Sequence, residues 1–179
     1  MRNGYGIEYN SNGNIYKGNF KDDNYEGYGI LFLSNGTIYE GEFKNDEIDG
    51  YAIIKFTDGK YEGEFKNGVI DGKGRLFGSY DIYEGEFENG KKDGYAIIYL
   101  PNGDRYEGEF INGIYNGYGI FYSHLGLQVK RYFKNDFSTK ILYIIYKIIL
   151  ILNYLYSRLI KNKMTLLFIF ILIIGIIIN

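Results

Sequence analysis

The sequence predicts an all-β repeat array, in which stacked antiparallel β-hairpins form an elongated twisted sheet, followed by a C-terminal hydrophobic α-helical tail. A motif of the form Tyr-x-Gly-x-Phe recurs five times at intervals of 22 or 23 residues, as repeat architectures require. Within each copy, residue types alternate with a period of two, which indicates β-strands. All acidic residues and all but one glycine precede residue 141, so the remaining segment is a region of a different kind.

The five copies share one internal register. They begin at Tyr16, Tyr39, Tyr61, Tyr83 and Tyr106. A glycine follows eleven residues after each of these tyrosines, at Gly27, Gly50, Gly72, Gly94 and Gly117, and Tyr-Gly-Ile or Tyr-Ala-Ile usually comes next. These spacings divide an array over residues 1–135 into a half repeat at 4–15, repeats at 16–38, 39–60, 61–82, 83–105 and 106–128, and a degenerate cap at 129–135.

Each repeat is predicted to be one hairpin. In Tyr39–Phe43 the aromatic residues and the glycine fall on one face of a strand and both glutamates on the other. In Tyr28–Phe32 the first, third and fifth residues likewise share a face. Asn-Gly and Asp-Gly pairs adopt positive φ readily, so we expect two-residue turns between the strands at Asn35-Gly36, Asp58-Gly59 and Asn102-Gly103.

The aromatic residues of the motif are the candidates for packing between repeats or for lining a groove. A single hairpin is marginally stable in water, so its aromatic face must be covered by neighbouring repeats. The glycine between tyrosine and phenylalanine leaves room for a ring from the next copy. The candidate aromatic positions are Tyr39, Phe43, Tyr61, Phe65, Tyr83, Phe87, Tyr106 and Phe110.

The stretch Tyr-Glu-Gly-Glu-Phe-x-Asn-Gly-x-x-x-Gly-Tyr-Gly, present at 106–119, resembles the MORN (membrane occupation and recognition nexus) repeat. The resemblance covers about residues 4–126. It implies an elongated, twisted antiparallel sheet with a groove along it. Members of that family are mostly scaffolds or targeting modules beside other domains, and some have been proposed to bind phospholipids. Where the family has Trp or Phe, as at Phe43, this chain always has Phe.

Two copies depart from the pattern. The third has Lys73-Gly74-Arg75 in place of Tyr-Gly-Ile, and Gly78-Ser79-Tyr80-Asp81 in place of a plain Asn-Gly turn. The last copy loses its turn signal at 123–126, as expected of a terminal repeat that caps a stack. Lys73 and Arg75 make a basic spot on an acidic array. They are either contacts of a groove or solvent-exposed substitutions at its rim.

The tail is predicted to meet a membrane. Residues 136–163 are expected to form a basic amphipathic linker helix, and 164–178 a short transmembrane or membrane-anchoring helix. Fifteen helical residues span about 22 Å, which is shorter than the ~30 Å hydrocarbon core, so flanking lysines would have to reach the headgroups. The candidate membrane-surface contacts are Lys140, Lys147, Arg158, Lys161 and Lys163.

The orientation of the array follows from the same residues. Met1 leads directly into a half repeat, with no signal peptide, and the basic residues flank the apolar segment on the side of the array. We therefore expect a membrane-associated chain whose repeats face the cytosol. The alternatives for the tail are an interfacial helix that does not span, and a translated stretch of AT-rich DNA with no role. The chain itself is either whole or a fragment that begins mid-repeat.

Catalytic constellations are scarce in this composition. There is no cysteine, which excludes disulfides, Cys-based zinc sites and cysteine nucleophiles. The recurrent acid–base candidates are Glu40/Glu42, Glu62/Glu64, Glu84/Glu86 and Glu107/Glu109. Catalysis would need one carboxyl pKa pushed away from the other, whereas repetition in every copy favours a solvent-exposed ladder. His124, the single histidine, is expected to be a loop residue. We expect no metal and no cofactor.

These observations favour a non-enzymatic, membrane-anchored repeat scaffold that mediates protein–protein interaction through its aromatic groove or an open sheet edge. The first 140 residues carry 22 acidic and 16 basic side chains, a net charge of −6, which disfavours nucleic acid. The same charge weakens the alternative, a peripheral phospholipid-binding module. An enzyme that uses the glutamate pairs is a remote alternative. The protein partner is unknown, and homo-oligomers through the sheet edge or the tail are compatible with the sequence.

Overall fold

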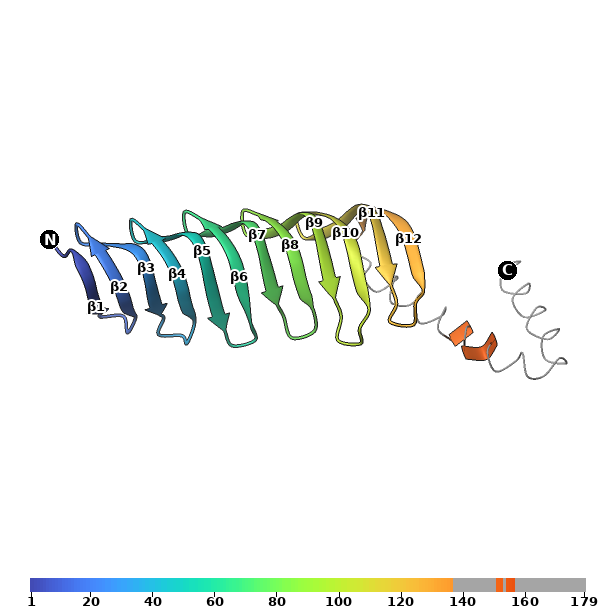
Figure 1. Cartoon of the computed structure of the whole chain (residues 1–179), viewed down its shortest axis with the longest axis horizontal. Helices are drawn as coiled ribbons and strands as arrows, with labels where there is room; N and C mark the ends of the chain where they lie inside the picture. The colour runs from blue at the N-terminus through green and yellow to red at the C-terminus, as the bar shows by residue number, and fades with distance from the viewer. Residues whose placement is uncertain (137–150, 153, 157–179) are drawn as a thin grey trace. The chain divides into compact units, whose positions relative to one another are not determined.

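The computed structural model describes residues 1–136, 151–152 and 154–156, and the first of these ranges holds one sheet (Figure 1). Its twelve strands are antiparallel and follow one another in sequence order, so each strand pairs only with its neighbours along the chain. The strands are β1 (Gly4–Tyr9), β2 (Ile15–Lys21), β3 (Asn24–Phe32), β4 (Ile38–Lys44), β5 (Glu47–Phe56), β6 (Gly59–Lys66), β7 (Val69–Phe77), β8 (Ile82–Glu88), β9 (Lys91–Tyr99), β10 (Arg105–Ile111), β11 (Ile114–Tyr122) and β12 (Gln128–Asp136). The predicted array of stacked antiparallel hairpins is confirmed.

The predicted C-terminal helix is not supported. The two units of the chain, Met1–Asp136 and Phe137–Asn179, are compact separately, and the second is described only at 151–152 and 154–156, which are helical. Most of the predicted linker helix and all of 164–178 lie outside the described residues. Asp136, where that helix was expected to begin, is instead the last residue of β12. Within the described residues, no helix has the length and apolar character needed to cross a membrane.

Turns in which both residues have positive φ lie at the opposite end of the hairpins from the predicted ones. At Asn67-Gly68 both residues have positive φ, 48° and 76°, as the primed hairpin turn requires. At the predicted site only Gly36 has positive φ, and the connection between β3 and β4 is a longer loop. In that loop the Leu33 N–H donates to Thr37 O over 2.9 Å. The predicted turns were therefore wrong. At Asn35-Gly36 and Asn102-Gly103 only the glycine has positive φ, and β5 joins β6 through Thr57 and Asp58, neither of which has positive φ.

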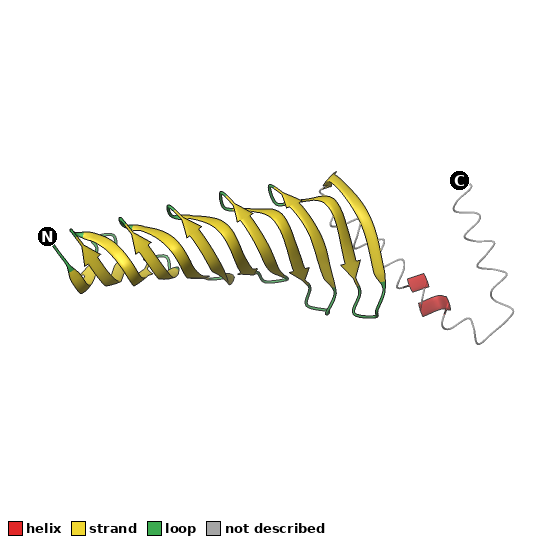
Figure 2. Ribbon diagram, turned by 45° about the horizontal axis from the view of Figure 1, so that its top comes forward, coloured by secondary structure: helices red, strands yellow, loops and turns green. Residues whose placement is uncertain are grey.

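A repeated bulge bends β3, β5, β7, β9 and β11. The pairing register shifts in each repeat just after the central glycine of the motif, for example between Gly63 and Phe65. Opposite this shift lies the glycine that follows eleven residues after each motif tyrosine, with φ of 107° at Gly72, a conformation that L side chains rarely adopt. The Glu64 carboxylate leans over Gly72 and accepts the Lys73 N–H at 2.9 Å. The strands are consequently curved rather than flat (Figure 2).

The core is a row of aromatic rings on one face of the sheet. Tyr61 makes edge-to-face contacts with Phe65 and with Phe87 of the next repeat, at centroid distances of 5.3 and 5.2 Å. Tyr83 contacts Phe87 at 4.9 Å and Phe110 at 5.4 Å, so the rings couple one repeat to the next. Each such pair adds about 0.5–1.5 kcal/mol to the stabilisation from burial. Burial also raises the pKa values of these phenols, as it does for Tyr16, whose pKa is raised to about 12.

The central glycine of the motif is required because a side chain at this position would clash with the adjacent strand, and Gly63→Ala tests this. A Cβ at Gly63 would lie 2.6 Å from both Gly74 Cα and the Lys73 carbonyl oxygen, which are backbone atoms of the adjacent strand. We expect a loss of about 1–3 kcal/mol in the free energy of unfolding, measured by urea denaturation in non-ionic detergent. Gly74→Ala is the comparison, since the three nearest atoms to its Cβ would all belong to the Tyr61 side chain and none to the backbone, and Ala52 occupies the corresponding position in the preceding repeat. Equal losses in both variants would contradict this explanation.

Candidate functional site

The aromatic positions singled out in the sequence lie in the core. The structure places all eight on a single face, where their rings cover one another. Tyr39 is half-buried and the other seven are buried: Phe43, Tyr61, Phe65, Tyr83, Phe87, Tyr106 and Phe110. The buried rings pack between repeats and are not exposed to a partner. The predicted membrane-surface contacts Lys140, Lys147, Arg158, Lys161 and Lys163 lie outside the described residues.

A second set of tyrosines is exposed on the opposite face of the sheet. Tyr28, Tyr51, Tyr95 and Tyr118 occupy the same position in their repeats, one residue after the bulge glycine, and are 54–66% exposed. We call this surface the tyrosine face. Each of the first three tyrosines lies opposite a glutamate of the following strand, as Tyr51 does opposite Glu64. Tyr28 donates its hydroxyl to Glu40 over 3.0 Å, and this hydrogen bond raises the pKa of Tyr28.

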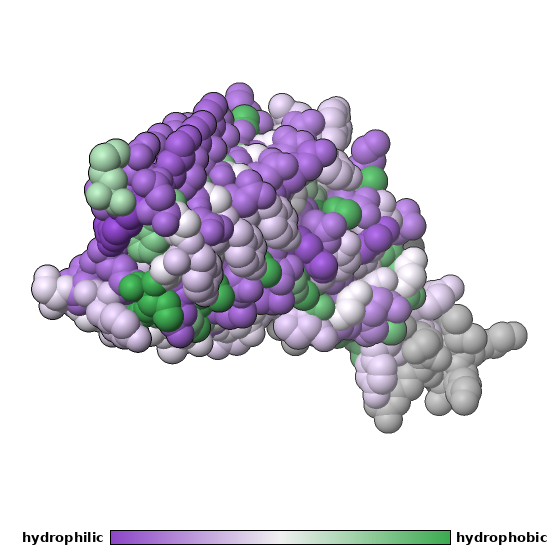
Figure 3. Space-filling model, turned by 60° about the vertical axis from the view of Figure 1, so that its left-hand side comes forward, coloured by the Kyte–Doolittle hydropathy of each residue, from purple (hydrophilic) through white to green (hydrophobic). Residues whose placement is uncertain are grey.

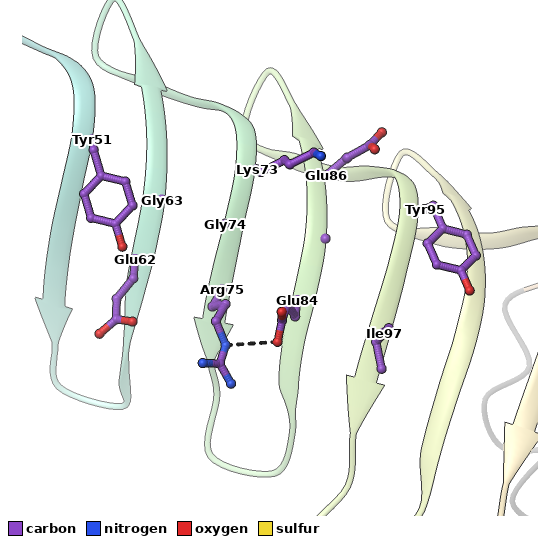
Figure 4. Close-up of a pocket in the computed structure, with 11 residues that line it drawn as sticks. Tyr51, Glu62, Gly63, Lys73, Gly74, Arg75, Glu84, Glu86, Tyr95 and Ile97 are labelled. Atoms are coloured by element: carbon purple, nitrogen blue, oxygen red, sulfur yellow. Dashed lines mark ion pairs between the residues drawn. The ribbon is translucent and has the colours of Figure 1, made fainter.

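Rows of like side chains run along the array, because every repeat presents the same residues at the same place (Figure 3). The row of exposed tyrosines is interrupted in the third repeat, where the corresponding residue of β7 is Lys73. A hollow of about 420 Å³ lies at this interruption, with Tyr51 and Tyr95 on its two sides and Lys73 and Arg75 between them (Figure 4). The two basic residues of the aberrant repeat thus lie in the hollow.

Some of the charged side chains in the hollow have ion-pair partners and others do not. Arg75 Nε lies 3.2 Å from a carboxylate oxygen of Glu84, and Glu62 is paired with Lys60 at 2.5 Å. Glu86 lies opposite Lys73 in the register, but its carboxylate leans over the bulge glycine Gly94 of the next strand. Among the residues that the structure describes, the exposed ammonium group of Lys73 has no ion-pair partner. The hollow therefore combines two aromatic walls with one unpaired cation.

Comparison with known proteins agrees with this architecture. A family model described as the MORN repeat matches six segments of the chain, at residues 1–15, 16–38, 39–60, 61–81, 83–105 and 106–124. The chain belongs to the MORN-repeat family. Each matched full MORN repeat holds one motif strand, one bent strand and the turn between them. The resemblance noted in the sequence is confirmed.

The other comparisons add little. No curated protein matches the chain. One solved structure that resembles this MORN array is the TCP domain of SAS-4 (dCPAP) of Drosophila melanogaster in complex with a proline-rich motif of Ana2 (dSTIL). The two are 16% identical, and the match covers 71% of this chain and 88% of that chain with a TM-score of 0.39. This score is too low for the likeness to bear on function.

In the four MORN repeats that carry two glutamates in the motif, the two have separate structural partners. The first is ion-paired, as between Glu40 and Lys55 at 3.5 Å and between Glu107 and Arg105 at 3.0 Å. The second leans over the bulge glycine, as Glu109 does over Gly117. The same arrangement recurs in these repeats, so each glutamate has a structural role in its own copy. In residues 1–136 and the described tail residues, no cluster of three metal-ligating side chains occurs.

His124 connects the loop between β11 and β12 to a neighbouring loop through hydrogen bonds. Its Nδ1 lies 2.7 Å from Oδ1 of the buried Asp104, and its backbone N–H donates to the same oxygen over 2.8 Å. Asn102 donates to the other carboxylate oxygen of Asp104 over 2.6 Å. The histidine therefore ties the loop after β11 to the loop before β10, which is a structural role.

Proposed function

We propose that this MORN-repeat chain is a non-enzymatic, membrane-anchored scaffold that holds a protein partner on its tyrosine face. The observation that carries the proposal is the row of exposed tyrosines, which occupy the same position in every full repeat except the third, on the face opposite the core. Tyrosine supplies a large, rigid surface with a hydrogen-bonding hydroxyl, which is why it is enriched at protein interfaces. MORN repeats as a family support a repeat scaffold of this kind.

A protein fits the tyrosine face better than a phospholipid surface does. Exposed aromatic rings in an ordered row mark interaction surfaces, because folding alone favours their burial. Glutamates border the tyrosines along this face, as Glu42 borders Tyr28 and Glu109 borders Tyr95. Their charge opposes contact with an anionic leaflet, which attracts lysine and arginine. Phospholipid binding by the repeats is therefore the second candidate.

The anchor is proposed from the composition of the tail. Residues 164–178 are apolar except for Thr165 and Gly175, and the residues after 140 carry basic but no acidic side chains. A basic segment next to an apolar one favours a cytosolic position for the basic side. We place the repeats in the cytosol, with the partner held close to the membrane surface.

Photo-crosslinking tests the proposed site. A photoreactive amino acid at position 51 or 95 of the full chain is expected to give an adduct with the same protein from both positions, because both side chains lie on one face. Position 80 is the matched control, since Tyr80 is 83% exposed but lies in the loop between β7 and β8. Adducts are measured by mass spectrometry after irradiation in cells.

Three results would oppose the proposal. Equal crosslinking from position 80 would mean that the adducts report exposure alone. Adducts with lipid instead of protein from positions 51 and 95 would favour the phospholipid alternative. Crosslinking to different proteins from the two positions would mean that the tyrosine face does not act as one surface.

A further inference from the structure

The tyrosines on either side of the hollow have a defined spacing. Tyr51 lies in β5 and Tyr95 in β9, at equivalent positions two repeats apart, and Lys73 lies midway in β7. Adjacent strands are about 4.8 Å apart, so one repeat advances about 9.6 Å along the array and the two tyrosines are separated by about 19 Å. A segment that lies across the strands would meet an aromatic ring, a cation and a second aromatic ring at equal intervals.

This interval matches the pitch of a polyproline II helix. That helix advances about 3.1 Å per residue with three residues per turn, so residues i, i+3 and i+6 share one face at intervals of about 9.3 Å. An extended β-strand has a similar rise, but its residues i and i+3 point to opposite sides. In an α-helix the nearest repeat on one face is about seven residues, or about 10.5 Å, which overshoots the tyrosine spacing by roughly 2 Å over two repeats.

The side-chain chemistry of Tyr51, Lys73 and Tyr95 also suits a polyproline II segment. Proline rings and polyproline II segments bind aromatic-lined grooves because the segment is already ordered before it binds. Lys73 offers an ammonium group that has no ion-pair partner among the described residues, whereas Arg75 is occupied by Glu84. The residue of the segment that faces Lys73 should therefore be acidic, and the residues three before and three after it should be prolines over Tyr51 and Tyr95.

We infer that the hollow between Tyr51 and Tyr95 binds a polyproline II segment of the partner with the pattern Pro-x-x-Glu/Asp-x-x-Pro. The inference rests on the proposed function, because it names the class of partner that the tyrosine face holds. It also gives the aberrant third repeat a role: Lys73 sets the charge of the ligand and the position of its acidic residue. Glu86, opposite Lys73 in the register, adds a negative charge to the lining of the hollow that opposes the ligand's carboxylate.

Fluorescence anisotropy with the full chain in non-ionic detergent tests the inference. The probe is a labelled peptide that contains Pro-Pro-Ala-Glu-Pro-Ala-Pro. Two control peptides accompany it: one has lysine in place of glutamate, and in the other the glutamate is moved by one position. We expect the first peptide to bind about two- to fivefold more tightly than either control peptide, as one exposed opposite-charge contact allows. Lys73→Tyr, which restores the residue of the other repeats, is expected to abolish this preference while proline-rich peptides still bind. Glu86→Gln is expected to strengthen binding of the glutamate peptide.

The outcomes separate the inference from the proposed function. If the preference for glutamate persists in Lys73→Tyr, or if moving the glutamate has no effect, the assignment of the acidic position is wrong. If no proline-rich peptide binds while a partner still crosslinks at positions 51 and 95, the inference fails and the proposed function stands. If neither peptides nor proteins contact these positions, both fail. Thermal unfolding of each variant checks that the exposed substitutions leave the array folded.

Discussion

Replacing Phe87 with alanine is expected to lower the free energy of unfolding of the array by about 3–5 kcal/mol, the cost of removing a fully buried phenylalanine. The ring is buried and contacts Tyr61 of the preceding repeat and Tyr83 of its own, at 5.2 and 4.9 Å. Each repeat contacts only its neighbours, so the stability of the stack is approximately a sum of repeat and interface contributions. Loss of one interface should therefore let the two halves unfold in separate steps.

Urea denaturation followed by circular dichroism measures this effect in the full chain in detergent. Phe56→Ala is the matched control, because Phe56 is 38% exposed at the end of β5, and its truncation should cost much less. A Phe87→Ala variant with an unchanged midpoint would show that the ring does not couple the repeats. A single sharp transition with a lower midpoint would support the burial of the Phe87 ring but contradict the separate unfolding of the two halves.

The largest effect is expected at the membrane, from Ile169→Asp together with Ile173→Asp. Each charge placed at the centre of an inserted helix costs about 2.5–3.5 kcal/mol on insertion scales. Together they exceed what the lysines and arginines of the tail contribute through attraction to an anionic leaflet, at ~1 kcal/mol per charge near the surface. We expect the double variant to move from the membrane pellet to the soluble fraction after cell lysis, with the circular dichroism of the array unchanged.

Val69→Asp provides the control for added acidic charge. Val69 is exposed at the start of β7, so an aspartate there changes the net charge without touching the tail. This variant should stay with the membrane. A wild-type chain that is already soluble without detergent would contradict the anchor, and so would a double variant that remains in the pellet.

The strands and their order could be predicted from the sequence because both depend on local information. Period-two alternation defines the strands, and a repeat too small to bury its own aromatic face has to stack on the next one. The positions of the turns with two residues of positive φ could not be predicted from such local patterns. Turn signals occur at both ends of the hairpins, such as Asn35-Gly36 at one end and Asn67-Gly68 at the other, and only backbone geometry shows which of them has two residues of positive φ.

The tyrosine face was missed because two sets of tyrosines look alike in the sequence. The ring of Tyr61 covers Gly63 and Gly74, whereas Tyr51 lies opposite Glu64 on the other face of the sheet. A signal was present: pairing the motif with the following Tyr-Gly-Ile places Gly108 opposite Gly119, and so fixes which residues share the glutamate face. The bulge at Gly72 was also not foreseen, since a register shift depends on pairing between strands.

The most direct measurement of the central claim is the affinity of the crosslinked partner for the full chain with Tyr51→Ser and Tyr95→Ser combined, compared with the wild-type chain at equal folded fraction. Both side chains are more than half exposed, so their removal should leave the unfolding midpoint unchanged. If the tyrosine face is the binding site, the dissociation constant should rise by about tenfold or more, since buried interface tyrosines carry much of the binding energy. An unchanged dissociation constant, with the partner retained as tightly as by the wild-type chain, would contradict the account.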